Sequence, residues 1–92
     1  MIKAETLAKI FKLLSVDARV RILQLLKQRS LCVTELTSQL GMTLSATSQH
    51  LRPLRNAGIV KTQKQGFFVY YYLDKEKMSL LKKAASELLS IG

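Results

Sequence analysis

The stretch 44-LSATSQHLRPLRNAG-58 decides the fold, because it predicts a short amphipathic helix with little side-chain bulk on its polar side. At 100° per residue, one stripe of this helix is expected to be buried: Leu44, Thr47, Leu51 and Leu54. The other side holds small or hydrogen-bonding residues: Ser45, Ala46, Gln49, Arg52 and Asn56, with Ser48 and His50 on its flanks. Such a helix presents hydrogen-bond donors and acceptors on small side chains, so a partner is able to approach it closely.

The residues around this helix supply its boundaries and a companion helix. Thr43 is placed to cap the first turn, and Gly58 follows the last turn, so the helix is expected over about residues 43–57. A shorter helix precedes it, with Thr34 as the expected cap and Gly41 as the expected terminator. A short helix, a glycine-containing turn and a second helix with a polar outer face form the helix-turn-helix plan.

Two further helices are predicted before this pair and one after it. Apolar residues recur at helical spacing over about residues 3–14, and a central second helix follows Ser15, which is placed to cap it. Residues 30–33, "SLCV", are expected to form an extended link. The last helix is expected over about residues 75–89, where apolar residues again form a stripe.

A β-hairpin is predicted between the polar helix and the last helix. Residues 59–63 and 67–73 are rich in β-branched and aromatic side chains, and the turn expected at 64–66 contains a glycine. In the second strand two sets of side chains alternate, so one set is expected to pack while the other meets solvent or a neighbour. The sets are Phe67, Val69, Tyr71 and Leu73, and Phe68, Tyr70 and Tyr72. The predicted fold is mainly α with a β-hairpin wing at 63–67: a winged helix-turn-helix of order α-α-α-α-β-β-α, in one domain over residues 1–92.

The distribution of charge points to a polyanionic partner. The chain carries a formal net charge of +9, and no Asp or Glu occurs between Leu36 and Leu73. Four cations lie inside this acid-free window: Arg52, Arg55, Lys61 and Lys64. A basic excess favours nucleic acid as partner. An ordinary solvated basic face is the alternative explanation, but it does not account for the polar helix that lies inside the window.

A slim polar helix of this kind suits the major groove of double-stranded DNA. Gln49 is able to form paired hydrogen bonds with adenine, whereas Arg52 suits a phosphate on the groove wall. The candidate DNA-binding residues are Thr43, Ser45, Ala46, Ser48, Gln49, His50 and Arg52 on the helix, with Lys64 and Gln65 on the wing. The sequence therefore predicts a DNA-binding protein.

Four segments resemble the ArsR/SmtB family of dimeric winged-helix transcriptional repressors. They are 19-RVRILQLL-26, 31-LCVTEL-36, 45-SATSQHLRPLRNAGIV-60 and 66-GFFVYYYL-73, which follow the order and spacing of the family's motifs. The resemblance implies a homodimer joined by the first and last helices, bound to a pseudo-palindromic operator near its own promoter. A two-fold dimer would place its recognition helices about 34 Å apart, which is one turn of DNA.

The terminal helices independently favour self-association. Both carry more apolar surface than so small a core uses, and an exposed apolar stripe indicates an interface. The candidate dimerisation residues are Leu7, Ile10, Phe11 and Leu14 on the first helix, with Met78, Leu81, Ala85 and Leu88 on the last.

Metal sensing is not expected, because the sequence lacks the ligands that metal-sensing members of the resembled family use. Arsenic-sensing relatives carry a C-V-C pair; Cys32 matches its first position, but Thr34 replaces the second cysteine. Zinc-sensing relatives use a histidine on the last helix, and residues 75–89 contain none. A tight zinc site needs three or four protein ligands. No metal site and no cofactor are predicted, and the inducer, whether small molecule or redox signal, is left open. Cys32 is either a thiol switch or, on the more common pattern, a small buried apolar residue.

Several other classes of protein are excluded or disfavoured. No apolar run approaches the roughly 18–20 residues of a membrane span, no secretion signal is present, and one cysteine suits a reducing cytoplasm. No carboxylate pair, phosphate-binding loop or nucleophile–base arrangement indicates an enzyme. The remaining alternative is a winged-helix protein-interaction or assembly module that does not bind specific DNA sequences, and whose DNA association would depend little on salt.

Overall fold

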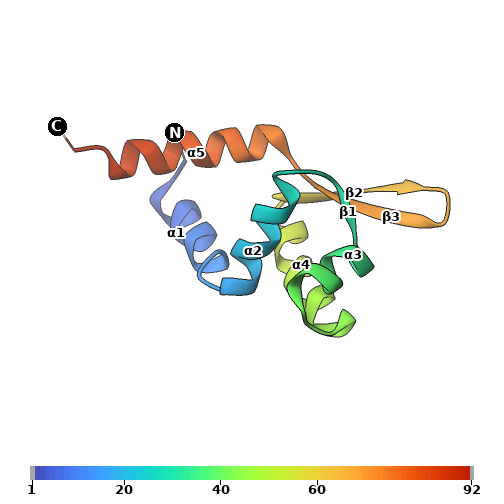
Figure 1. Ribbon diagram of the computed structural model, residues 1–92. Coiled ribbons are helices and arrows are strands. Elements are labelled where there is room, and N and C mark those ends of the chain that lie inside the picture. Colours follow the sequence, from blue (N-terminus) through green and yellow to red (C-terminus); the bar gives the residue numbers. More distant parts are fainter. Residues whose placement is uncertain (1, 92) are drawn as a thin grey trace.

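The computed structural model describes residues 2–91, which form five helices and three strands (Figure 1). In chain order they are α1 (Ala4–Leu13), α2 (Asp17–Leu26), β1 (Leu31–Cys32), α3 (Val33–Leu40), α4 (Leu44–Asn56), β2 (Val60–Gln65), β3 (Phe68–Leu73) and α5 (Lys75–Leu89). The predicted winged helix-turn-helix is confirmed, with the two-residue strand β1 as an addition. None of the helices within residues 2–91 has the length and apolarity needed to cross a bilayer.

The elements form a helical body from which two parts project. Helices α1 to α4 pack together, while the β2–β3 hairpin and α5 extend from the body in opposite directions (Figure 1). The molecule is accordingly elongated, with principal extents of 48 × 24 × 21 Å. The hairpin and α5 therefore offer surfaces that the body does not cover.

The core lies where α2, α3, α4 and the base of the hairpin meet. Its fully buried side chains are Ile22, Leu36, Thr47, Leu51, Leu54, Ile59 and Val60. Each buried aliphatic side chain contributes roughly 1.5–3 kcal/mol relative to an exposed one. Because Leu51 and Leu54 belong to this cluster, the inner side of α4 is fixed and its opposite side faces outward.

Three threonines lock the helix-turn-helix. Thr47 is the one buried polar residue recorded within residues 2–91. Its hydroxyl donates to the Thr43 carbonyl oxygen at 3.0 Å and accepts a hydrogen bond from the Thr37 hydroxyl at 2.9 Å. Thus α3 and α4 are joined by a satisfied polar contact inside the core. Gly41 ends α3 at φ 66°, a left-handed conformation that glycine adopts without steric cost, and lets the chain turn into α4.

The three strands form one antiparallel sheet in the order β1-β3-β2. Leu31 of β1 pairs with Tyr71 of β3, and the hairpin register runs from Val60–Leu73 to Gln65–Phe68. Strand β1 was not predicted, because a two-residue strand is recognisable only from its partner. The hairpin turn also lies further along the chain than the turn predicted at residues 64–66. The strand pairing continues through residue 65, and the turn consists of Gly66 and Phe67.

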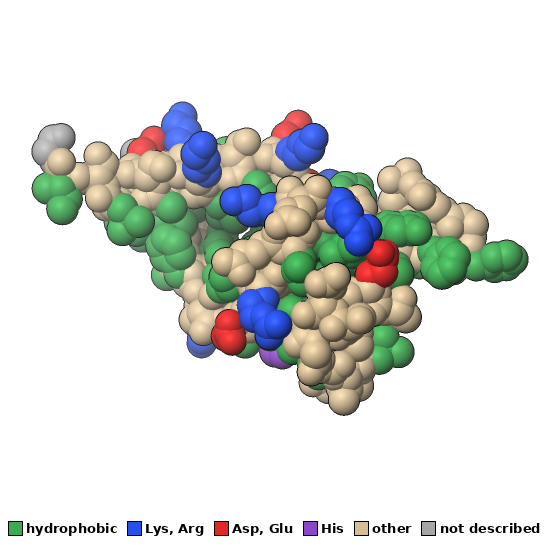
Figure 2. Space-filling view, in the orientation of Figure 1, with side chains coloured by type: hydrophobic (Ala, Val, Ile, Leu, Met, Phe, Trp, Pro, Cys, Tyr) green, Lys and Arg blue, Asp and Glu red, His purple; other side chains and the backbone are tan. Residues whose placement is uncertain are grey.

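The predicted alternation of β3 holds only near the body. Tyr71 and Leu73 pack against the core, so the set to which they belong is the inner one. Phe67 and Val69, expected on the same face, are exposed instead. The hairpin projects beyond the helical body there, so no core remains for these side chains to cover (Figure 2).

The corner between α1 and α2 differs from the prediction. Ser15 does not cap α2; its hydroxyl donates to the Lys12 carbonyl oxygen at 2.6 Å, and Val16 occupies the cap position. Nearby, Arg19 Nη1 donates to the Leu13 carbonyl oxygen at 3.1 Å. Carbonyl groups at a helix C-terminus lack hydrogen-bond donors within the helix, and these two side chains act as the donors. The serine thus ends one helix rather than starting the next.

Two details of α3 and α4 also differ from the prediction. Helix α3 begins one residue after Cys32, so Thr34 lies in the first turn and does not cap it. Leu44, expected in the buried stripe, is 51% exposed. It is the first residue of α4, where the chain has only just left the turn, and the core covers the helix from Thr47 onward.

Candidate nucleic-acid interface

The outward face of α4 carries the predicted contact residues. Ser45, Ser48, Gln49 and Arg52 are exposed, and Ala46 is half-buried. The Thr43 side chain accepts a hydrogen bond from the Ala46 backbone N–H at 3.1 Å, which confirms the predicted cap and fixes the first turn. No hydrogen bond from the four exposed side chains to another part of residues 2–91 is recorded, so their donors and acceptors are available to a ligand.

His50 is less available than its neighbours. The imidazole is half-buried, and Nδ1 is buried with no hydrogen-bond partner in the described part of the chain. Nε2 is therefore the ring nitrogen that is able to face a ligand. The prediction that His50 lies on the flank of the polar side is consistent with this position, whereas its contact with DNA stays a prediction.

A polar notch separates α4 from the hairpin. The hollow measures about 600 Å³, and its lining is Ser48, Leu51, Arg52, Arg55, Asn56 and Tyr71. Two guanidinium groups and no carboxylate line it, so it attracts an anion such as a phosphate. The sequence-based selection omitted Arg55, Asn56 and Tyr71. Arg55 was recognisable from its place one turn after Arg52, but Tyr71 joins the notch only through the sheet register.

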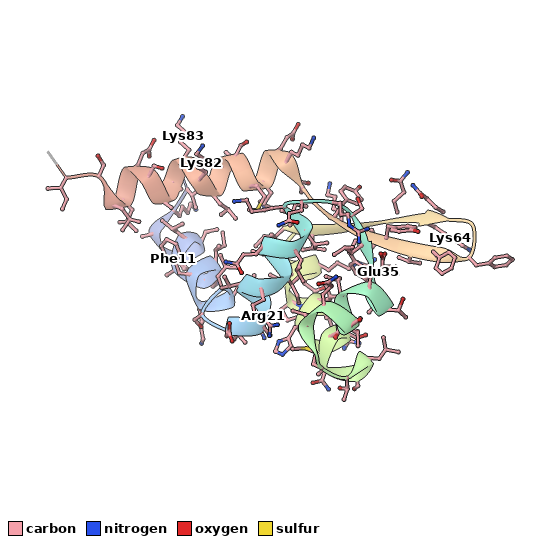
Figure 3. The ribbon with its side chains drawn as sticks, viewed as in Figure 1. Phe11, Arg21, Glu35, Lys64, Lys82 and Lys83 are labelled. Atoms are coloured by element: carbon pink, nitrogen blue, oxygen red, sulfur yellow. The ribbon has the colours of Figure 1, made fainter. Side chains whose placement is uncertain are left out.

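The predicted wing residues lie on opposite faces of the hairpin. Lys64 is exposed on β2 and pairs with Val69, on the face that continues to Tyr71 and the notch. Gln65 pairs with Phe68 on the other face. Of the two, Lys64 thus lies on the same face as the notch. Figure 3 shows Lys64 on the projecting hairpin.

One cation of the acid-free window pairs with a carboxylate of the same chain. Lys61 Nζ lies 2.8 Å from Asp74 Oδ2, at the junction between the hairpin and α5. The hydrogen bond from Lys61 is the main cause that lowers the pKa of Asp74, and the same contact raises the pKa of Lys61. Asp74 also accepts from the Lys77 backbone N–H at 2.9 Å and so caps α5. Positive potential on the surface formed by α4 and the hairpin thus comes mainly from Arg52, Arg55 and Lys64.

The predicted dimerisation residues are divided between an inner and an outer layer. Leu7 and Leu81 are each 9% exposed and belong to the chain's own interior. Between α1 and α5 lies an apolar hollow of about 200 Å³, lined by Leu7, Ile10, Phe11, Leu14, Leu23, Met78, Leu81, Lys82 and Ala85. Phe11 at its edge is 41% exposed, and Leu88 further along α5 is 59% exposed. Apolar side chains follow the underside of α5 towards its end (Figure 2).

Cys32 is a buried free thiol at the start of α3. Its Sγ lies 3.1 Å from Thr34 Oγ1, and its backbone N–H donates to Glu35 Oε1 at 3.0 Å. That backbone hydrogen bond is the main cause that lowers the pKa of Glu35. Residues 2–91 contain no group of three or more His, Cys, Asp or Glu side chains placed to hold a metal ion. The backbone N–H of Cys32 thus takes part in the cap of α3, and its thiol contacts the Thr34 hydroxyl.

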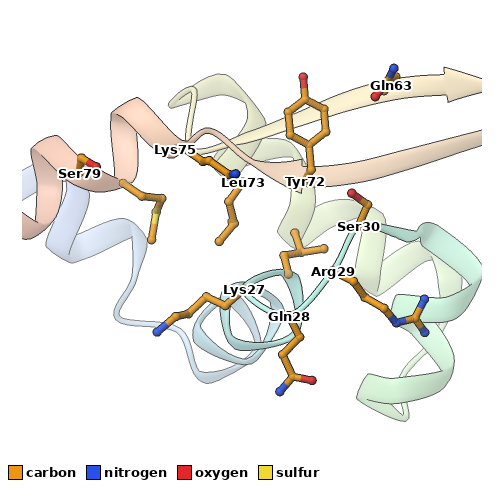
Figure 4. A pocket seen from close by; sticks show the side chains of 11 residues that line it. Lys27, Gln28, Arg29, Ser30, Gln63, Tyr72, Leu73, Lys75 and Ser79 are labelled. Carbon is orange, nitrogen blue, oxygen red and sulfur yellow. The ribbon is translucent and has the colours of Figure 1, made fainter.

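A third hollow, larger than the notch, lies away from α4, between the end of α2, the base of the hairpin and the start of α5 (Figure 4). It measures about 710 Å³, with Leu26, Leu73 and Met78 as apolar lining and Lys27 and Lys75 among its polar residues. None of the predicted DNA-contacting residues lines it, so this hollow is separate from the α4 surface.

Known proteins resemble this chain in both sequence and fold. The family model described as "Bacterial regulatory protein, arsR family" matches residues 17–62. The "Cadmium resistance transcriptional regulatory protein CadC homolog" of Staphylococcus aureus is 41% identical over 90 residues, which cover 92% of this chain and 74% of that protein.

Solved structures agree with these matches. HlyU from Vibrio cholerae, whose curated name is "Transcriptional activator HlyU", superimposes with a TM-score of 0.75 at 34% identity, covering 97% of this chain and 98% of that one. A homodimeric winged helix-turn-helix DNA-binding domain from Mycobacterium bovis, described as a possible ArsR-family regulator, gives a TM-score of 0.74 at 28% identity, covering 94% and 83%.

The family match spans half of the chain, the curated relatives are transcriptional regulators, and the fold carries an exposed polar helix beside a basic notch. The chain therefore belongs to the arsR family of bacterial regulatory proteins and is a DNA-binding transcriptional regulator, not an enzyme.

Proposed function

We propose that two copies of this chain bind a pseudo-palindromic DNA operator, with α4 of each copy in the major groove. The observation that carries this proposal is the outward face of α4, where small and hydrogen-bonding side chains border a notch with two arginines. Residues 1–92 then act as one DNA-binding domain, with residues of about 3–14 and 75–89 as dimerisation helices. The experiment is selection of bound duplexes from a random-sequence library.

The residues divide between phosphate and base contacts. Arg52 and Arg55 in the notch suit phosphates along the groove wall, and Lys64 suits the backbone beside the hairpin. The base edges are assigned to the first turns of α4, where Gln49 is the exposed side chain with paired donor and acceptor groups. The remaining proposed contacts are Thr43, Ser45, Ala46, Ser48, His50 and Gln65.

The two copies are proposed to associate through α1 and α5. Phe11 and Leu88 leave apolar surface exposed at and beyond the hollow between these helices, and a partner of the same kind would cover it. The homodimeric relative from Mycobacterium bovis has the same fold, which supports association of two copies. A two-fold axis would present both α4 helices to one side of a duplex.

The regulatory outcome is proposed to be repression in the cytoplasm. A dimer bound across a promoter excludes polymerase, and the cadmium-resistance relative is a regulatory protein of the same family. HlyU carries the name of an activator, so a reporter under the selected operator decides between the two outcomes. The burial of Cys32 favours an ordinary packing role for that thiol over a switch.

Replacement of Gln49 by Ala is expected to relax base preference. Loss of a bidentate base contact costs about 1–3 kcal/mol, so affinity for the selected operator should fall about tenfold while affinity for random DNA stays the same. Fluorescence anisotropy with both duplexes measures the difference. Equal affinity of Gln49→Ala and the unaltered protein for both duplexes would show that α4 does not read bases through this residue.

Replacement of Arg52 by Ala is expected to weaken binding to all sequences by a similar factor. Loss of one phosphate contact lowers the slope of log affinity against log salt by about one per protomer. Lys83→Ala removes the same charge from an exposed position on α5, which points away from α4 (Figure 3), and serves as the matched control. A salt-independent affinity for both variants and the unaltered protein would favour the protein-interaction alternative.

A further inference from the structure

The tip of the hairpin exposes an aromatic side chain completely. Phe67 is 100% exposed, and its neighbours Phe68 and Val69 are 58% and 42% exposed. The tip is a projecting apolar end of the molecule in Figure 2. These three consecutive side chains form a contiguous exposed apolar patch at a projecting tip, and such a patch indicates an interaction site.

The turn holds this side chain at the outermost point. Gly66 adopts φ 62°, and no other residue of the turn has positive φ. A glycine with positive φ at the first of two turn positions fits the type II′ hairpin turn. Phe67 occupies the second position, beyond the last pair of the ladder, Gln65 and Phe68. The tip is thus narrow, and Phe67 alone caps it.

The surroundings of the tip favour a polyanion such as DNA. Lys64 and Gln65 precede the turn, and no carboxylate occurs between Leu36 and Leu73. The strand face that bears Lys64 continues into the arginine-lined notch beside α4. The apolar tip is therefore the end of the same surface that is proposed to follow the duplex.

The length of the hairpin agrees with the spacing of the grooves. Six-residue strands span roughly 20 Å. Half a turn of duplex, roughly 17 Å, separates the major groove from the neighbouring minor groove along the axis. This length suits a tip that extends to the adjacent minor groove when α4 occupies the major groove.

We propose that Phe67 enters this minor groove as an apolar wedge that partly unstacks a base step next to the sequence read by α4. Apolar side chains inserted in this way kink the duplex, and flexible pyrimidine–purine steps such as TA resist least. Phe67 then selects for deformable flanking DNA. The inference rests on the proposed placement of α4 and goes beyond it, because it assigns a separate determinant of sequence preference to the wing.

Phe68 supplies a matched control within the same tip. Its ring lies 6.4 Å from the ring of Tyr70, on the strand face that carries Gln65 and points away from the notch. It is aromatic, exposed and adjacent in sequence, but it already contacts another ring of the protein. We therefore assign the wedge to Phe67 and an intramolecular contact to Phe68.

The test uses the duplex selected from a random library, with 2-aminopurine placed in turn at each step flanking the α4 site. The unaltered protein should raise the fluorescence of one flanking position on each side, since unstacking relieves quenching. Phe67→Ser should abolish this increase and reduce affinity on the order of tenfold, which is typical of a lost aromatic stacking contact. Phe67→Leu should keep most of both effects, because leucine also acts as a wedge.

Three results of the DNA-binding measurements would overturn the proposal. They are an unchanged affinity in Phe67→Ser, a loss of affinity with no fluorescence change in the unaltered protein, and equal losses in Phe67→Ser and Phe68→Ala. Failure of the selection itself would instead refute the proposed operator binding, so the two failures are distinguishable. Sedimentation without DNA completes the test: self-association that disappears in Phe67→Ser would assign the tip to a second copy and also overturn the wedge.

Discussion

Replacement of Phe11 by Asp should convert the protein to monomers and lower its affinity for the selected operator by more than about a hundredfold. The side chain is 41% exposed at the edge of the apolar hollow between α1 and α5, so a carboxylate there would be desolvated in an interface but remains solvated in a monomer. Loss of the partner removes the second α4 helix, and the gain from binding two half-sites together is commonly 10²–10⁴.

Sedimentation equilibrium measures the oligomeric state, and anisotropy measures the affinity of the same samples. Ala8→Asp adds an identical charge at an exposed position of α1 outside the hollow, and it should leave the dimer intact. Leu88→Asp tests the same surface from α5, where the side chain is 59% exposed. Leu81 is unsuited to this test because it is buried in the core, and its replacement would unfold the chain. Dimers that persist in both Phe11→Asp and Leu88→Asp would place the interface elsewhere.

Replacement of Ser45 by Glu should have opposite effects on folding and on DNA binding. Ser45 is exposed in the first turn of α4, where a carboxylate interacts favourably with the helix dipole, so thermal stability should stay the same or rise slightly. In the major groove the same carboxylate would face phosphates and base acceptors, and such like-charge contacts cost several kcal/mol. Operator affinity should fall by about a hundredfold or more.

The control for Ser45→Glu separates local contact from overall charge. Gln28→Glu makes the same change in net charge at an exposed position after α2, beside the hollow that lies away from α4. It should reduce affinity only slightly, and the reduction should disappear with added salt. Similar losses for both variants at physiological salt would mean that α4 does not enter the groove. Thermal unfolding of each variant confirms that any loss is not a folding defect.

Local signals in the sequence were sufficient for the elements that depend on a few neighbouring residues. Thr43 caps α4 and Gly41 ends α3 as predicted, and α5 spans Lys75–Leu89 as expected from its apolar stripe. These features follow from hydrogen bonds within one turn or from helical spacing, so that tertiary structure does little to alter them.

Features that depend on pairing between distant segments were not predictable. Strand β1 exists because Leu31 and Cys32 meet β3, and a two-residue segment has no periodicity to detect. Tyr71 lines the notch because the sheet register turns it towards α4. The pairing of Lys61 with Asp74 likewise joins two segments that the sequence places far apart, and it removes one cation from the predicted basic surface.

The hydroxyl contacts among Thr37, Thr43 and Thr47 have a consequence for how such regulators diversify. They and the core hold α3 against α4 from the inner side, and the exposed side chains at positions 45, 48 and 49 are not part of these contacts. Target choice is therefore a separable trait. A duplicated gene that changes these three codons would encode a protein that folds as before but binds a different DNA sequence.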